Sequence, residues 1–507
     1  MQILWQYIVG VLTLCVVLLF WIREQRARRR FAGLSSYPLL PFIGNIHQIF
    51  GDSKALFRHI AHVSEVCENN ESGMFVIWIG HCPLLVVQDP EDVRTITNAF
   101  VEKPYIYSFG KIWLGDGLVT APVSTWKQNI RKLAGTFSSS VVDSYLGVFN
   151  AQAKKLVDNL LMEVGQEPFD IMQKYLAYTT LEAICQTALG VSKISENIVT
   201  TEYYVAFNRC LELLVNRGMN AFVHPDFTYK LTPKYQEIKK CVRVLHNVSD
   251  TVMRKRKYER EKLRTEEMKE KKTGDTEGPK FKAFLDILLD LREIDPSLTE
   301  QQIKSEVDTI IVGGQETVAS TMFYTLLLLG CKTRVQEKVY AEMKSIFGDS
   351  TRPVTKEDLS EMKYLEAVIN ETLRMYPPLP GVLRYADRDL QIKSFTIPKG
   401  TICAINGWGA GRSASVWGKD SALYRPERWL EDQPPGNTAS FLAFSYGRRA
   451  CIGKKYAMAI LKTVISQCVR ELEFISEADN MQFKVDIGLR PTCGHLIQVR
   501  RRESLQK

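Results

Sequence analysis

The sequence lacks the cysteine and histidine patterns of zinc-binding and disulfide-bonded proteins. Its 507 residues contain no C-x-x-C pair. Among the seven histidines, His59 and His62 share a helical face, and we assign them no role because exposed surface histidines are commoner than ligands. The 11 cysteines are scattered and odd in number, which favours free thiols in a reducing compartment. These absences exclude a fold built on structural zinc or on disulfide bonds.

The sequence also lacks internal repeats, Gly/Ser-rich linkers and nucleic-acid-binding motifs. Its net charge of +9 is partly local, because arginines cluster between residues 23 and 30. This cluster favours an anionic membrane surface or an acidic protein partner over nucleic acid. Residues Gly73–Asp89 predict a small two-stranded sheet, and helical periodicity dominates from Glu91 to the middle four hundreds. We therefore expect one large catalytic domain over residues 46–507, mainly α with small β-sheets.

Apolar runs long enough and free enough of charge to cross a membrane are absent except at the N-terminus. Residues Ile3–Ile22 are apolar apart from Gln6 and Thr13. As a helix this run is about 30 Å long, enough to cross a hydrocarbon core. The arginines that follow predict that the C-terminal side faces the cytosol. We predict a membrane anchor at 1–22 and a basic, proline-rich linker at 23–45, with a cleaved signal peptide or a buried core helix as alternatives.

The most informative motif is the ten-residue run F-S-Y-G-R-R-A-C-I-G at Phe444–Gly453. It places Cys451 in a glycine-punctuated loop beside arginines, and nearby positive charge and backbone N–H groups favour a thiolate. A haem iron can be bound by one such sulfur. Phe444 can cover the face of the macrocycle next to the sulfur, and Arg449 can reach a propionate. A buried free cysteine at a loop–helix junction is the alternative for an isolated cysteine.

A second motif interrupts a long apolar segment. Lys304–Gly330 predicts one helix that contains Gly313-Gly-Gln-Glu316-Thr317. Adjacent glycines inside a helix cost about 1 kcal/mol each relative to alanine. We therefore expect the helix to open locally beside the acid and the alcohol. A close helix–helix contact is the alternative.

The chain resembles the cytochrome P450 family over essentially its full length. The resemblance is carried by F-x-x-G-x-R-x-C-x-G around Cys451 and by the segment that ends in Glu316-Thr317. It implies haem b with Cys451 as axial ligand, and Gly453 close to the cofactor. It also implies that Thr317 hydrogen-bonds dioxygen and that Glu316 helps to deliver protons to a dry pocket.

The same resemblance implies a structural triad. Glu371-Thr-Leu-Arg374 lies on a predicted helix, Tyr364–Tyr376, and Arg428 follows in Pro-Glu-Arg-Trp. Spacing of three residues puts Glu371 and Arg374 on one helical face, where an exposed ion pair is the alternative. In the family these three side chains form a buried charge cluster. Buried charges persist when they are paired and hydrogen-bonded, so we predict a structural role.

Trp126, Arg384 and Arg449 are the expected partners of the haem propionates. One departure concerns the helix of Trp126, where the family usually has W-x-x-x-R. Here position 130 is isoleucine and Arg131 comes one residue later. One residue turns a helical side chain by roughly 100°, which makes Arg131 a weak candidate.

Several segments resemble the fourth P450 family and its insect relatives, which often oxidise fatty-acid chains. Many of those proteins carry a glutamate, esterified to haem, where this chain has Gly313, so we predict no such covalent link. Tyr105–Pro122, Tyr203–Phe222 and Leu489-Arg490-Pro491 are expected to border a lipophilic substrate.

The resemblance implies a monooxygenase of the endoplasmic reticulum membrane with its catalytic domain in the cytosol. Electrons would come from NADPH through NADPH–cytochrome P450 reductase, with cytochrome b5 as a second possible donor. Arg448, Lys454 and Lys455 would offer acidic partners a basic surface, although solvated surface charge explains them equally well. A haem-dependent peroxide isomerase or dehydratase and a haem carrier or sensor remain alternatives. The intact Glu316–Thr317 pair argues against the isomerase.

Overall fold

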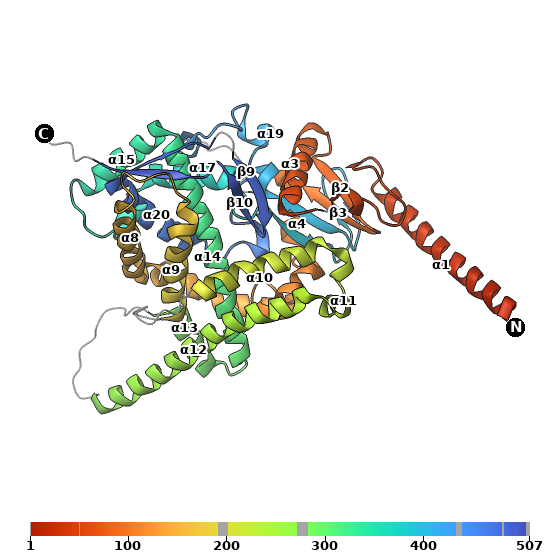
Figure 1. The fold of residues 1–507 in the computed structure, drawn as a ribbon, viewed down its shortest axis with the longest axis horizontal. Coiled ribbons are helices and arrows are strands. Elements are labelled where there is room, and N and C mark those ends of the chain that lie inside the picture. Colours follow the sequence, from red (N-terminus) through yellow and green to blue (C-terminus); the bar gives the residue numbers. More distant parts are fainter. Residues whose placement is uncertain are drawn as a thin grey trace. The chain divides into compact units, whose positions relative to one another are not determined.

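Two compact units make up the chain in the computed structural model (Figure 1). The structure describes residues 2–49, 51–190, 201–270, 282–431, 439–478 and 481–502. The sheet unit comprises Met1–Pro104, Pro380–Ala422 and Gly436–Ala450, and the helical unit comprises Tyr105–Leu379, Leu423–Pro435 and Cys451–Lys507. Neither unit is a continuous stretch of sequence. Helices predominate, which confirms the expected mainly α fold with small sheets.

The sheet unit is built on five strands in the order β1-β2-β3-β7-β4. β2 pairs antiparallel with β3, and β3 pairs in parallel with β7. The strands of this unit are β1 (Ser35–Ser36), β2 (Met74–Ile79), β3 (Cys82–Val87), β4 (Gly381–Tyr385), β5 (Leu390–Gln391), β6 (Thr396–Ile397) and β7 (Ile402–Asn406). Its helices are α1 (Gln2–Arg30), α2 (Ile46–Ile49), α3 (Ser53–Asn69), α4 (Pro90–Ala99), α18 (Gly407–Ala410), α19 (Ala414–Trp417) and the 3₁₀ turn η6 (Gly447–Arg449).

The expectation of a small two-stranded sheet at 73–89 was wrong, because five strands make up this sheet. β2 and β3 form as predicted, but β7 and β4 extend their sheet from a segment some 300 residues later. The helical periodicity expected up to the middle four hundreds therefore fails between residues 381 and 406. Alternation within one strand says nothing about partners that are distant in sequence.

A buried apolar cluster joins this sheet to α4. Asp89 caps α4 by accepting hydrogen bonds from the N–H groups of Glu91 and Asp92, and Pro90 occupies the first turn. Val93 and Ile96 then lie on the buried face of α4, against strand residues such as Leu85. This packing fixes the end of α4, and η6 lies against α4.

α1 is the one helix among the described residues that is long and apolar enough to cross a membrane. Its apolar window, within Leu4–Arg30, has a mean hydropathy of 2.1 and is wholly unburied. The helix continues past Ile22 to Arg30, so the basic residues expected in a linker are helical. Glu24 anchors this end, because its carboxylate pairs with Arg28 at 2.5 Å and accepts from the N–H of Phe42 at 3.2 Å.

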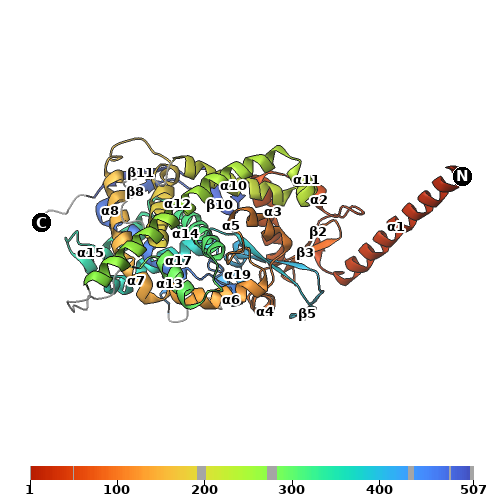
Figure 2. The same ribbon diagram turned by 90° about the horizontal axis from the view of Figure 1, so that it is seen from below.

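The helical unit surrounds the long helix α14, and α10 and α12 lie side by side in it (Figures 1 and 2). Its strands are β8 (Leu472–Ser476), β9 (Gln482–Asp486), β10 (Gly488–Cys493) and β11 (Ile497–Arg501), paired as β9–β10 and β8–β11. Its longer helices are α6 (Val123–Leu133), α8 (Leu146–Leu161), α9 (Ala177–Leu189), α10 (Thr201–Met219), α12 (Pro233–Glu270), α13 (Phe284–Ile294), α14 (Glu300–Cys331), α15 (Thr333–Phe347), α17 (Lys363–Met375) and α20 (Lys454–Glu471). Its shorter ones are η1 (Tyr105–Gly110), α5 (Lys111–Leu114), η2 (Ala134–Phe137), α7 (Ser139–Ser144), η3 (Met172–Leu176), η4 (Ala221–Val223), α11 (Asp226–Lys230), α16 (Lys356–Glu361) and η5 (Pro426–Trp429).

α14 is unbroken through its glycine pair, so the expected local opening was wrong. The alternative holds for Gly314, because a Cβ there would lie 2.7 Å from Cδ1 of Ile184 on α9. Gly313 has no such neighbour and is exposed. One glycine of the pair thus serves helix packing, and the other leaves a face of α14 uncovered.

Glu371, Arg374 and Arg428 are fully buried within the helical unit, as predicted for the triad. Arg374 donates to both carboxylate oxygens of Glu371 at 2.8 Å, and Nε of Arg428 donates to Oε1 at 3.1 Å. The N–H of Arg425 and the indole of Trp429 complete the donors at 2.8 and 3.0 Å. One carboxylate therefore ties α17 to η5, an arrangement that suits a structural role.

Candidate active site

Cys451 belongs to the helical unit and lies three residues before the first residue of α20, Lys454. Gly453 is the residue that precedes the helix, and a Cβ there would lie 3.9 Å from the sulfur. Surrounding protein raises the pKa of the Cys451 thiol, whereas the backbone N–H of Gly453 and the ammonium of Lys454 lower it. The residue as a whole remains exposed. A helix N-terminus and a neighbouring lysine suit a metal-ligating thiolate.

The loop before the cysteine, in the sheet unit, is held against the end of α4. Gly447 has a φ of 72°, and a Cβ there would lie 2.7 Å from the carbonyl oxygen of Thr97. Nε of Arg449 donates to the carbonyl of Val101 at 3.1 Å, and the Phe444 ring is half-buried beside Phe441. Both the turn and the close approach require glycine at 447.

Three cations gather in the sheet unit. Arg384 on β4 is 2% exposed and its Nη2 donates to Oγ of Ser445 at 3.4 Å. Burial lowers the pKa of Lys103 well below its usual value, and the charges of Arg449 and Arg384 lower it further. Arg384 is buried, and Lys103 and Arg449 are half-buried. Carboxylates such as haem propionates fit this donor set. Sequence reasoning missed Lys103, which lies between Glu102 and Pro104.

α6 presents a different set of residues to the interior of the helical unit from the one the family pattern implies. Trp126 and Asn129 are buried, Ile130 is half-buried, and Arg131 is exposed. The exposure of Arg131 agrees with its predicted turn away from the face of Trp126. Asn129, which the sequence gave no reason to single out, donates to Oε1 of Glu306 on α14 at 2.8 Å.

Glu306 is a second residue that sequence reasoning missed. It is fully buried and also accepts from the N–H of Leu118 at 3.0 Å and from Gln302 at 2.8 Å. Burial raises its pKa to about 7, although these three donors lower it. The loop before Leu118 lies so close to α14 that a Cβ on Gly117 would be 2.5 Å from a backbone oxygen. Glu306 therefore holds this loop and α6 against α14. In the sequence, an acidic residue within a largely apolar helix was the signal that could have identified it.

Glu316 and Thr317 lie one turn above the uncovered face of Gly313 on α14. The Thr317 hydroxyl donates to the carbonyl oxygen of Gly313 at 2.6 Å. Glu316 is largely buried and pairs with Arg490 on β10, whose Nε and Nη2 lie 2.8 and 2.7 Å from Oε1. Glu316, which was expected to deliver protons, is therefore held by the guanidinium of Arg490. From the sequence, Arg490 was expected only to border the substrate.

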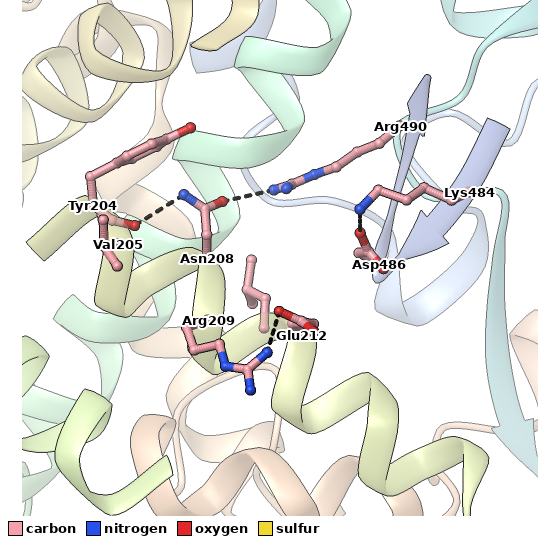
Figure 3. Close-up of a pocket in the computed structure, with 9 residues that line it drawn as sticks. Tyr204, Val205, Asn208, Arg209, Glu212, Lys484, Asp486 and Arg490 are labelled. Atoms are coloured by element: carbon pink, nitrogen blue, oxygen red, sulfur yellow. Dashed lines mark hydrogen bonds and ion pairs between the residues drawn. The ribbon is translucent and has the colours of Figure 1, made fainter. Parts of the chain in front are cut away.

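A pocket of about 330 Å³ opens between α10 and the β9–β10 hairpin (Figure 3). Polar side chains dominate its wall, with Arg209 paired to Glu212 and Lys484 paired to Asp486. Arg490 reaches into it from the hairpin and Asn208 from α10. The lining residues are Tyr204, Val205, Asn208, Arg209, Leu211, Glu212, Lys484, Asp486 and Arg490.

The three segments expected to border the substrate contribute unequally to this pocket. Tyr203–Phe222 supplies the α10 wall and Arg490 the opposite one, whereas Leu489 is buried and its N–H donates to the carbonyl of Pro378 at 2.8 Å. Tyr105–Pro122 does not line it. That segment begins at Tyr105, whose hydroxyl hydrogen-bonds His224 at 2.7 Å.

Comparisons with known proteins identify the family of this chain. The family model described as cytochrome P450 matches residues 35–494. "Cytochrome P450 4c21" of Blattella germanica is 30% identical over 94% of this chain and 95% of its own length. "Cytochrome P450 4g15" of Drosophila melanogaster is 30% identical over 97% and 96%. "Cytochrome P450 4V2" of Mus musculus is 31% identical over 91% and 88%. Proteins of this family are monooxygenases that contain haem with a cysteine thiolate on the iron. This chain is a member of the cytochrome P450 family.

Proposed function

We propose that Cys451 is the thiolate ligand of a haem with which the protein inserts one oxygen atom into a lipophilic substrate. The position of Cys451 carries this proposal, since its sulfur lies beside the N–H of Gly453 and the charge of Lys454 at the start of α20. Both groups favour a thiolate. The haem, when bound, supplies reductive activation of dioxygen, which a thiolate ligand promotes by donating electron density.

Arg384, Arg449 and Trp126 are our candidates for the propionates, and Lys103 joins them. The cations of the sheet unit already lie close enough to depress the pKa of Lys103, so bound carboxylates would relieve their mutual repulsion. Phe444 and Gly453 would pack against the macrocycle. With isoleucine at 130 and Arg131 exposed, α6 offers Trp126 rather than an arginine.

Glu316 and Thr317 would manage protons. The Thr317 hydroxyl can donate a hydrogen bond to dioxygen if it breaks its bond to the carbonyl of Gly313. Glu316 lies one residue away on the same helix. General acid–base groups at fixed positions contribute about 10²–10⁴-fold to such reactions. The triad Glu371, Arg374 and Arg428 would hold the fold without touching the reacting atoms.

The substrate class that suits the protein is lipophilic: a fatty-acid-like chain, a hormone-like molecule or a xenobiotic. α1 would keep the protein in the endoplasmic reticulum membrane with its catalytic part facing the cytosol. NADPH–cytochrome P450 reductase would supply electrons, and cytochrome b5 would be a second donor. Exposed Arg448, Lys454 and Lys455 favour such acidic partners.

The proposal is tested with the full-length protein, reconstituted with reductase and NADPH. Products are analysed after incubation with a panel of fatty acids, terpenoids and xenobiotics. Cys451→Ala should abolish the thiolate-type spectrum of the reduced carbon monoxide complex, whereas Cys493→Ala, a control at another exposed cysteine, should keep it. If Cys451→Ala retained that spectrum, the ligand assignment would be wrong.

A further inference from the structure

The pair formed by Glu316 and Arg490 links the acid of the oxygen-activation motif to the pocket wall. Both donors of Arg490 reach the same oxygen, Oε1, at 2.7 and 2.8 Å. The Glu316 side chain is 8% exposed and that of Arg490 is 25% exposed. Two charge-assisted bonds at a largely buried carboxylate fix its orientation.

The same guanidinium has a second partner on another element. Nη2 of Arg490 donates to Oδ1 of Asn208 at 2.9 Å, and Nδ2 of Asn208 donates to the carbonyl of Tyr204 at 3.0 Å, one turn earlier on α10 (Figure 3). The amide of Asn208 is thereby held with its oxygen toward Arg490. A chain of bonds runs from α10 through Arg490 to α14.

The hairpin that carries Arg490 is fixed independently of α10. The hydroxyl of Tyr324 on α14 donates to the carbonyl of Leu489 at 3.2 Å. A Cβ on Gly488 would lie 3.4 Å from the carbonyl oxygen of Pro378 and 3.5 Å from Oε1 of Glu316. The backbone therefore approaches Glu316 closely on this side. Glu316 lies on α14, to which the hairpin of Arg490 is fixed. Asn208, the other partner of Arg490, lies on α10 in the wall of the pocket.

We propose that Arg490 is a positioning residue that orients the carboxylate of Glu316 and, through Asn208, makes that orientation depend on helix α10. A ligand that displaces the α10 wall weakens the Asn208 bond and lets Arg490 and Glu316 reorient together. Proton delivery is thus tied to occupation of the pocket. This inference rests on the proposed role of Glu316 in oxygen activation.

Arg490→Gln tests the first half of the inference in the reconstituted full-length enzyme. The readout is product formed per NADPH consumed, together with hydrogen peroxide released. We expect this ratio to fall by about tenfold, less than the 10²–10⁴-fold that loss of a general acid costs, while peroxide rises. Arg490→Lys, which keeps the charge next to Glu316, should restore most of the ratio. Lys155→Gln removes an ion-paired cation outside the pocket and should leave the ratio unchanged.

A double-mutant cycle separates positioning from a loss of structure. If Arg490 acts through Glu316, adding Arg490→Gln to Glu316→Gln should change the ratio by less than about twofold, the scatter of independent effects. The double variant also leaves no buried charge unpaired, so it tests the inference even if Arg490→Gln alone folds poorly. An additional tenfold loss in that background would overturn the inference, as would a normal ratio in Arg490→Gln or an equal loss in Lys155→Gln.

Hydrogen–deuterium exchange tests the link to α10 without turnover. Asn208→Leu removes the bond to Arg490 but leaves the pair with Glu316. Peptides from Thr201–Met219 should shift to faster exchange in Asn208→Leu and in Arg490→Lys, but not in Lys155→Gln. Unchanged exchange in both would refute the coupling to α10. If the wild-type enzyme made no NADPH-dependent product, the proposed function would fail, and these exchange data would still decide the link.

Discussion

Replacing Glu306 by glutamine should change how stability depends on pH. Glu306 is fully buried in α14, and its two oxygens accept from Leu118, Asn129 and Gln302. Glutamine has the same shape and no charge. The amides of Asn129 and Gln302 can rotate to present their oxygens to the new NH₂ group, so the packing is retained.

The magnitude follows from the raised pKa. Burial raises the pKa of Glu306 from 4.5 to about 7. At about 1.4 kcal/mol per pKa unit, this rise corresponds to about 3.5 kcal/mol. Because the folded pKa lies above the unfolded one, the folded state holds the proton more tightly. The associated stability is fully present below about pH 4.5 and is lost as pH rises through about 7.

We therefore expect Glu306→Gln to lose this part of the pH dependence. Between pH 5 and pH 8 the wild-type protein should lose about 2–3 kcal/mol of unfolding free energy that the variant keeps. At pH 8 the variant should be the more stable protein. Buried Asp308, whose pKa burial also raises to about 7, contributes a further loss in both proteins and cancels in the comparison.

Denaturant unfolding of the two proteins at pH values from 5 to 8, followed by tryptophan fluorescence, measures this difference. Glu300→Gln is the matched control on the same helix, since Glu300 is exposed and its ion pair with Lys257 lowers its pKa. The ion pair of Glu300 with Lys257 stabilises the folded protein at pH values above the usual pKa of a glutamate. The unfolding free energy of Glu300→Gln should therefore fall, relative to that of wild type, as the pH rises. Parallel pH curves for wild type and Glu306→Gln would refute the reasoning.

Two further substitutions test the frame of the site. Glu371→Ala leaves the buried guanidiniums of Arg374 and Arg428 without their carboxylate and should cost about 3–5 kcal/mol; a denaturation midpoint close to that of wild type would contradict a structural triad. Gly447→Ala forces a residue with a Cβ into a φ of 72° and against the carbonyl of Thr97. The strain should cost about 1–3 kcal/mol and lower the fraction of protein that retains haem, and a variant with normal haem content would show that the loop has room.

Patterns that depend on neighbouring residues were readable from the sequence. The helix around Glu371 and Arg374 was expected at Tyr364–Tyr376 and forms at Lys363–Met375. The helix around Glu316 was expected at Lys304–Gly330 and forms at Glu300–Cys331. Apolar periodicity and caps are local properties, so these bounds shift by only a few residues.

The glycine pair shows where such reasoning stops. The intrinsic cost of Gly313 and Gly314 suggested an opening, but Ile184 on α9 approaches Gly314, and the helix continues. The helix propensity of the two glycines amounts to about 2 kcal/mol, and packing against a neighbouring helix outweighs it. Nothing in the sequence near α14 says which helix will lie against it.

The sequence by itself determined the family and the mainly helical fold, because the motifs that carry them, such as the run around Cys451, are short and have fixed spacing. Only the tertiary structure showed that Glu316 is paired with Arg490, and that Glu306 pins α6 and the Leu118 loop. Those contacts join residues more than a hundred positions apart. Their partners are chosen by chain topology and burial, which local periodicity does not encode.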